Sequence, residues 1–172
     1  AENEIDAQIV SLSGRYYTMD RDKRWERIKR GYDVIVQRKG NVVDSAATAI
    51  QMSYDNGVTD EFIEPVVIGD ERVLMQNGDV VLFFNFRADR MRQIVAAFAN
   101  DDFAGFTTVH PNLNIFTMTN YDPDLPVSVL FDKDNVTMPL AEVVSQAGLS
   151  QYHSAETEKY PHVTFFLNGG VE

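Results

Sequence analysis

Residues 14–30, GRYYTMDRDKRWERIKR, hold seven of the 15 basic residues of a 172-residue chain whose formal net charge is -11. From Asp20, a suitable N-cap, the sequence predicts an amphipathic helix with charges on its outer face. Its inward stripe recurs at helical spacing: Trp25, Ile28, Tyr32 and Ile35. The fold is therefore expected to form around this helix, with its charged face and the residues just before it left outside the core.

Two arginines of this stretch are poorly explained as ordinary surface charges. Arg15 follows a glycine at the end of an apolar run, and Arg21 lies where the helix is predicted to begin. Cations there meet the unfavourable positive end of the helix dipole, so a bound anion is a plausible compensation. Planar guanidinium groups hold carboxylates and phosphates through two parallel hydrogen bonds. We predict that the stretch is half of an anion site; the alternative, a solvated helix face, suits Lys23, Lys29 and Arg30.

A second pair of arginines follows a predicted strand. Residues 77–79 are a turn signal, and the continuous apolar and aromatic run at residues 80–86 predicts a strand buried on both faces. Arg87 and Arg90 come directly after it and would share a face of the first turn of a helix. Because ligands of open α/β sheets bind outside the carboxyl ends of strands, this pair is predicted to complete the anion site. The alternative is a pair of surface arginines balanced by Asp89.

Strands and helices are predicted to alternate along the chain, which is typical of an α/β fold, here expected as a layered α/β/α architecture with a mixed sheet. A further helix is predicted to follow a cap at Asp44 or Ser45 and to stop at residues 56–57. The other strands are expected at residues 7–12, 66–68, 113–119 and 127–131.

The last quarter of the chain is predicted to be separate from the rest. Residues 132–137 are polar and indicate a linker between a domain at residues 1–131 and a segment at residues 138–172. In that segment we expect a helix from Pro139 to about Ala147. Two strands are expected after it, near residues 151–154 and 163–167.

Composition excludes several classes of function. With 26 acidic against 15 basic residues, we expect no nucleic-acid partner and no attraction to an anionic membrane. Cysteine is absent, which rules out disulfides and thiolate metal sites within this sequence. The three histidines share no ligand spacing and are expected to be structural: His110, His153 and His162. The carboxylates near Asp60 suit hard cations, but we predict no metal ligand and no catalytic residue in this chain.

Four long runs carry a resemblance to a known family. They are SGRYYTMDRDKRWERIKRGYD at 13–33, TDEFIEP at 59–65, DVVLFFNFRADR at 79–90 and AETEKYPHVTFFLNGG at 155–170. In this order they resemble the cofactor-independent phosphoglycerate mutases, metal-dependent members of the alkaline phosphatase superfamily. The resemblance covers nearly the whole chain but only the middle of such an enzyme.

The resemblance implies a function and a set of site residues. Residues 1–131 would be the C-terminal part of a substrate-binding domain, and residues 138–172 a piece of the phosphatase domain. The enzyme would interconvert 3-phosphoglycerate and 2-phosphoglycerate through a phosphoserine. Its two divalent cations, manganese or magnesium, would be bound by ligands outside this chain. The implied substrate-binding residues are Arg15, Arg21, Arg87, Arg90 and Lys159.

Further expectations follow from the same resemblance. The parent enzyme would be a cytoplasmic monomer, and this chain alone, which lacks the nucleophilic serine, would be inactive. Ala88 departs from the family, in which many members have proline there, and both neighbouring arginines are kept. Two alternatives stay open: a non-catalytic module that binds a small sugar phosphate or carboxylate, and another phosphomutase of the superfamily, such as a phosphopentomutase.

Overall fold

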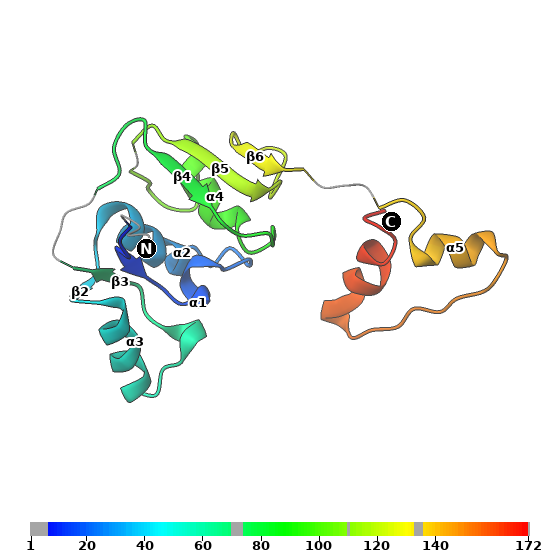
Figure 1. Cartoon of the computed structure of the whole chain (residues 1–172), viewed down its shortest axis with the longest axis horizontal. Helices are drawn as coiled ribbons and strands as arrows, with labels where there is room; N and C mark the ends of the chain where they lie inside the picture. The colour runs from blue at the N-terminus through cyan, green and yellow to red at the C-terminus, as the bar shows by residue number, and fades with distance from the viewer. Residues whose placement is uncertain (1–6, 70–73, 110, 133–135, 172) are drawn as a thin grey trace, which may run out of the picture. The chain divides into compact units, whose positions relative to one another are not determined.

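The computed structural model describes residues 7–69, 74–109, 111–132 and 136–171. It divides into two compact units, Ala1–Asp132 and Lys133–Glu172 (Figure 1). Of the predicted linker, residues 133–135 lie outside the described residues. The first unit combines helices with strands along the chain, so the predicted α/β class is confirmed.

The first sheet of unit 1 is mixed, as predicted. Its strands are β1 (Ser11–Leu12), β2 (Asn41–Val43) and β3 (Val66–Ile68), in the order β1-β3-β2, with β1 antiparallel and β2 parallel to β3. Of the strand predicted at residues 7–12, only the last two residues form β1, and the Val10 carbonyl before them accepts from Ile68 N at 3.0 Å. Arg38 donates to the carbonyl oxygens of Ile68 and Gly69 at 3.1 and 2.8 Å and so fastens the preceding helix to this sheet.

The second sheet is parallel. It consists of β4 (Val80–Phe83), β5 (Asn114–Thr119) and β6 (Ser128–Phe131) in that order (Figure 1). A strand forms within the predicted residues 80–86, but its pairing ends at Phe83. The prediction that both of its faces are buried is wrong, because Val80 is 67% exposed. The other face is covered, because Phe83 packs edge-on against Phe98 of α4 (Arg92–Ala99). A continuous apolar run predicts a strand that is covered on both faces. Among the described residues, α4 covers one face of β4, and the face that carries Val80 is exposed.

The core of unit 1 forms around α2 (Trp25–Gln37), which packs against α4 on one side and contacts β3 on the other. Ile28 and Tyr32 of the predicted stripe are fully buried, which confirms that part of the prediction. Trp25 is half-buried against Phe103. Val36 is buried on the same face as Ile28 and Tyr32, and Val34 is buried on the face near Gly40 and Val67 of the first sheet. Two faces of α2 are therefore buried, because it lies between the two sheets.

Short helical segments complete unit 1. They are α1 (Arg15–Thr18), α3 (Ala46–Asp55) and the 3-10 turn η1 (Asp60–Phe62). Of the two predicted caps of α3, Ser45 is the one that accepts a hydrogen bond from the backbone N–H of Thr48, at 3.1 Å. A side chain at Gly14 would collide with the carbonyl of Glu61, so only glycine lets α1 approach η1 this closely.

The second unit contains α5 (Leu140–Gln146), the 3-10 turn η2 (Thr157–Lys159) and the π-helical turn η3 (His162–Phe166). The predicted helix is confirmed, but both predicted strands are wrong. Residues 151–154 form no strand, and residues 163–167 lie mostly within η3. Their β-branched and aromatic side chains favour strands, yet no strand is described in this unit to pair with. The backbone bonds locally instead, as Asn168 N does to Thr164 O at 2.9 Å.

Candidate anion-binding site

The structure brings together two loops of unit 1 around Asp89. Arg87 donates to this carboxylate twice, from Nε to Oδ1 at 2.6 Å and from Nη2 to Oδ2 at 3.0 Å. Arg21, which is 68 residues from Asp89 in the sequence, donates from Nη1 to the same Oδ2 at 3.1 Å. The two halves of the predicted site therefore meet, and a chain carboxylate lies between them.

Arg90 joins the same two loops by a different contact. Its Nη1 donates to the carbonyl oxygen of Met19 at 3.1 Å. Its Nε is buried and has no hydrogen-bond partner among the described residues. Arg87 and Arg90 were predicted to lie on the first turn of a helix, which is wrong, because α4 begins at Arg92. They lie in the turn before it, where the Ala88 carbonyl accepts from the N–H groups of Met91 and Arg92.

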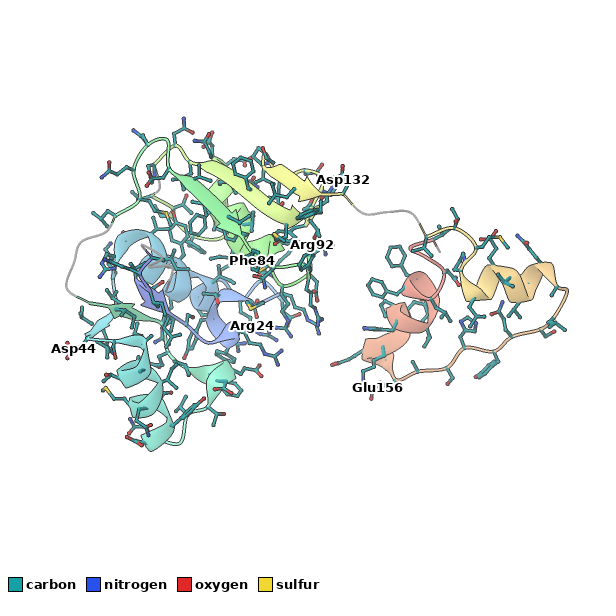
Figure 2. All side chains as sticks on the ribbon, viewed as in Figure 1. Arg24, Asp44, Phe84, Arg92, Asp132 and Glu156 are labelled. Carbon is teal, nitrogen blue, oxygen red and sulfur yellow. The ribbon has the colours of Figure 1, made fainter. Side chains whose placement is uncertain are left out.

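The loop that carries Arg87 is held by the end of β5. The Tyr121 hydroxyl, in a side chain only 1% exposed, bonds the carbonyls of Phe83 and Asn85. Arg92 donates from Nε to the carbonyl of Tyr121 at 2.7 Å. Figure 2 labels Phe84 and Arg92, at either end of this loop. These bonds fix the backbone on both sides of Arg87, so its position does not depend on ion pairs alone.

The loop that carries Arg21 is organised by Asp20. Its carboxylate is 3% exposed and accepts from the backbone N–H groups of Asp22 at 2.9 Å and Arg24 at 3.0 Å. Between them Lys23 adopts a positive φ of 58°, and α2 begins only at Trp25. The prediction that Asp20 caps a helix starting beside it is therefore wrong by one turn. The Asp20 carboxylate accepts backbone N–H groups as a helix cap would, but it closes a loop instead. Arg21 therefore lies in that loop and not in a helix.

The remaining two predicted residues lie elsewhere. Arg15, on α1, pairs with Glu61 at 2.7 Å and does not contact Asp89. Lys159 belongs to the second unit and pairs with Glu156, labelled in Figure 2, at 2.7 Å; both side chains are exposed. Of the five predicted residues, the structure thus brings three together, Arg21, Arg87 and Arg90.

The carboxyl groups of Asp89 and Asp20 are ionised at neutral pH, because both pKa values are lowered. Hydrogen bonds from Arg87, and further from Arg21, lower the pKa of Asp89 to about 2. Burial by itself would raise the pKa of Asp20, but the backbone hydrogen bonds from Arg24 and Asp22 lower it below the usual value. Each guanidinium has five N–H donors, of which Asp89 takes one from Arg21 and two from Arg87. Further donors on both arginines can bind another anion.

Sequence reasoning missed the organising residues. Asp20 was interpreted as a helix cap, although an Asp that accepts backbone N–H bonds can equally close a loop. Asp89 was weighed only as a counter-charge for the neighbouring arginines, and its bond to Arg21 has no local signal. The bonds of Tyr121 to the β4 loop join residues 36 or more positions apart, which no local pattern indicates.

Other candidates do not form a reactive site in the described part of the chain. No three His, Cys, Asp or Glu side chains gather there as metal ligands would. His153 bonds Gln151 and the Val163 carbonyl, and His162 lies on the ring of Phe166. His110 lies outside the described residues. None of the described helices has the length and apolar character needed to cross a membrane.

The first unit is an α/β domain in which arginines of two loops converge after the end of a parallel strand, and similarity to known proteins identifies its family. The family model described as the N-terminus of BPG-independent phosphoglycerate mutase (PGAM) matches residues 1–123. The chain therefore belongs to the 2,3-bisphosphoglycerate-independent phosphoglycerate mutase family, which confirms the resemblance seen in the sequence.

Individual relatives agree. Proteins named 2,3-bisphosphoglycerate-independent phosphoglycerate mutase are 51% identical over 97% of the chain in Aliarcobacter butzleri and 49% identical over 96% in Flavobacterium psychrophilum. A crystal structure of Leishmania mexicana phosphoglycerate mutase, at low cobalt concentration, superposes with a TM-score of 0.75 and 33% identity over 98% of the chain. The chain spans about a third of the length of each: 34%, 34% and 33%.

Proposed function

We propose that this chain is the substrate-binding part of a metal-dependent mutase that interconverts 3-phosphoglycerate and 2-phosphoglycerate through a phosphoserine. Arg15, Arg21, Arg87 and Arg90, together with Lys159 of the second unit, would bind the carboxylate and phosphoryl groups. The observation that carries the proposal is the convergence of Arg21, Arg87 and Arg90 after the end of β4, in a chain of this family.

Cationic side chains meet the physical needs of such a reaction. Once the phosphoryl group leaves the substrate, the remaining glycerate has to turn and receive it on the other hydroxyl without escaping. Fixed guanidinium groups can hold its carboxylate throughout and offset negative charge on the transferring group. The donors of Arg21 and Arg87 that Asp89 leaves unused are suited to this task.

Two divalent cations, manganese or magnesium, would stabilise the transferring group when bound in the longer protein. The described residues do not fit such a site, because no three possible ligands gather among them. The role that we derive for this chain is therefore confined to substrate binding. We further propose that the longer protein is a cytoplasmic monomer. Family membership favours the mutase over a non-catalytic anion-binding module, although the same arginines suit both.

Binding can be tested on the chain itself. We expect 3-phosphoglycerate to shift backbone NMR signals of the loops around Arg21 and Arg87 at low ionic strength. The dissociation constant should be about millimolar or weaker, because exposed ion pairs contribute only about 0–1 kcal/mol each. Arg87→Ala should reduce the shifts that 3-phosphoglycerate causes. Lys39→Ala, which removes an exposed cation bonded only to Gln37 in the described contacts, is the matched control. Equal shifts in Arg87→Ala and the wild type would contradict the proposal.

A further inference from the structure

We propose that Asp89 is a positioning residue of this site, whose carboxylate holds the guanidinium groups of Arg21 and Arg87 together for one phosphorylated ligand. The inference rests on the proposed function of the two arginines. It is carried by the geometry: Arg87 Nη2 and Arg21 Nη1 donate to the same oxygen, Oδ2 of Asp89, at 3.0 and 3.1 Å. No other described side chain bridges the two loops through an ion pair.

Without Asp89, little would keep the two guanidinium groups close. Both side chains are substantially exposed, 41% for Arg21 and 60% for Arg87. They carry like charges, and long side chains lose rotamer freedom when they are fixed. A shared carboxylate offsets the repulsion and provides the hydrogen bonds that define one arrangement. Two cations and one anion still leave a net positive charge to attract a phosphate.

Asp89 is itself held in place, as a positioning residue must be. It lies in the turn closed by the hydrogen bonds from Met91 N and Arg92 N to the Ala88 carbonyl, at 2.9 and 3.2 Å. Its side chain is 32% exposed, less than either arginine. The carboxylate is therefore the least exposed of the three charged groups, and both arginines donate to it.

An alternative role for Asp89 is competition with the ligand. A carboxylate that merely occupied the arginines would have to leave before an anion could bind, and its removal would strengthen binding. The hydrogen bonds argue against this role, because Asp89 takes one donor of Arg21 and two of Arg87 out of five on each. The two roles predict opposite signs for the effect of removing the charge.

The test compares Asp89→Asn with Asp22→Asn in the isotope-labelled 172-residue chain. Asp22 is a matched control, since it is an exposed carboxylate on the Arg21 loop that pairs with an arginine, Arg24, outside the cluster. Both changes remove one negative charge near the site. One measurement follows the exchange of the Arg87 Nε proton with water, without ligand; the other follows titration with 3-phosphoglycerate at low salt.

We expect Asp89→Asn to speed the exchange of the Arg87 Nε proton and to weaken 3-phosphoglycerate binding by about threefold to tenfold, the scale of one or two exposed ion pairs. The melting temperature should stay close to that of the wild type. Asp22→Asn should leave the exchange unchanged and bind equally or slightly more tightly. Equal or tighter binding by Asp89→Asn would overturn the inference while leaving the proposed function intact. Absence of binding by the wild-type chain would instead contradict the proposed function, and the positioning role with it.

Discussion

The buried stripe of α2 and the two arginine loops are held in place by different interactions within the same unit. Ile28 and Tyr32 are 0% exposed and are fixed by apolar packing against α4. Arg21 and Arg87 are largely exposed and are fixed by one carboxylate and by backbone hydrogen bonds. Apolar burial stabilises the fold strongly, whereas exposed ion pairs contribute little to stability. The loop arginines are thus free to be used for binding, and substitutions should separate the two regions.

The largest effect on stability is expected from Phe98→Ala. Phe98 is 2% exposed and its ring contacts both Tyr32 and Phe83, so its removal leaves a cavity between α2, α4 and β4. We expect the free energy of unfolding to fall by about 3–5 kcal/mol, measured by urea denaturation. A loss below about 1 kcal/mol would show that the core does not depend on this contact.

Asp20→Ala should have an intermediate effect. It leaves the N–H groups of Asp22 and Arg24 without their buried acceptor, which should cost about 1–3 kcal/mol. Asp22→Ala, an exposed change in the same loop, should alter stability by no more than about 0.5 kcal/mol. Equal melting curves for the two variants would mean that Asp20 does not organise the loop.

Sequence periodicity predicted the first region well and the second only in part. The i, i+3, i+7 spacing of Trp25, Ile28 and Tyr32 indicates burial on a helix directly, because residues three or four positions apart lie on one face of the helix. The meeting of Arg21 with Arg87 was predicted only as two halves of a site. The bridge by Asp89 spans 68 residues, and no local spacing encodes such a contact.

In the second unit, too, the sequence pattern could not predict a structure that depends on distant residues. The strand predicted at residues 163–167 contains β-branched and aromatic residues, whose preference for strands holds when a partner strand is present. The chain forms η3 there instead. The roles of the five predicted binding residues stay predictions, and three of them, Arg21, Arg87 and Arg90, can be examined as one cluster.

Arg15→Ala should change stability less than either substitution above. The side chain is 51% exposed and its described ion pair is with Glu61, itself 38% exposed. Loss of this pair should cost about 0–1 kcal/mol in urea denaturation. A loss as large as that of Phe98→Ala would assign Arg15 to the fold and not to the ligand.

Acid should release the Asp89 cluster with only a small effect on stability. The pKa of Asp89 is about 2 in the folded chain, below its ordinary value of about 3.9. A depressed pKa means that the stabilisation is complete above about pH 4 and is lost as the pH falls toward 2. We expect the carboxyl carbon signal of Asp89 to stay constant from pH 7 to about pH 4. A titration midpoint of this signal near pH 4 would show that Asp89 does not form these ion pairs in solution.

We propose that the loop arginines bind substrate without supporting the fold. The most direct test is Arg87→Ala in a full-length mutase that contains this segment, with turnover and melting temperature measured on the same preparation. Loss of a charge-assisted bidentate contact costs about 1.5–3 kcal/mol, so kcat/KM for 3-phosphoglycerate should fall by about one to two orders of magnitude. The melting temperature should hardly change. Near-normal turnover, or a loss of turnover that only follows unfolding, would contradict the account.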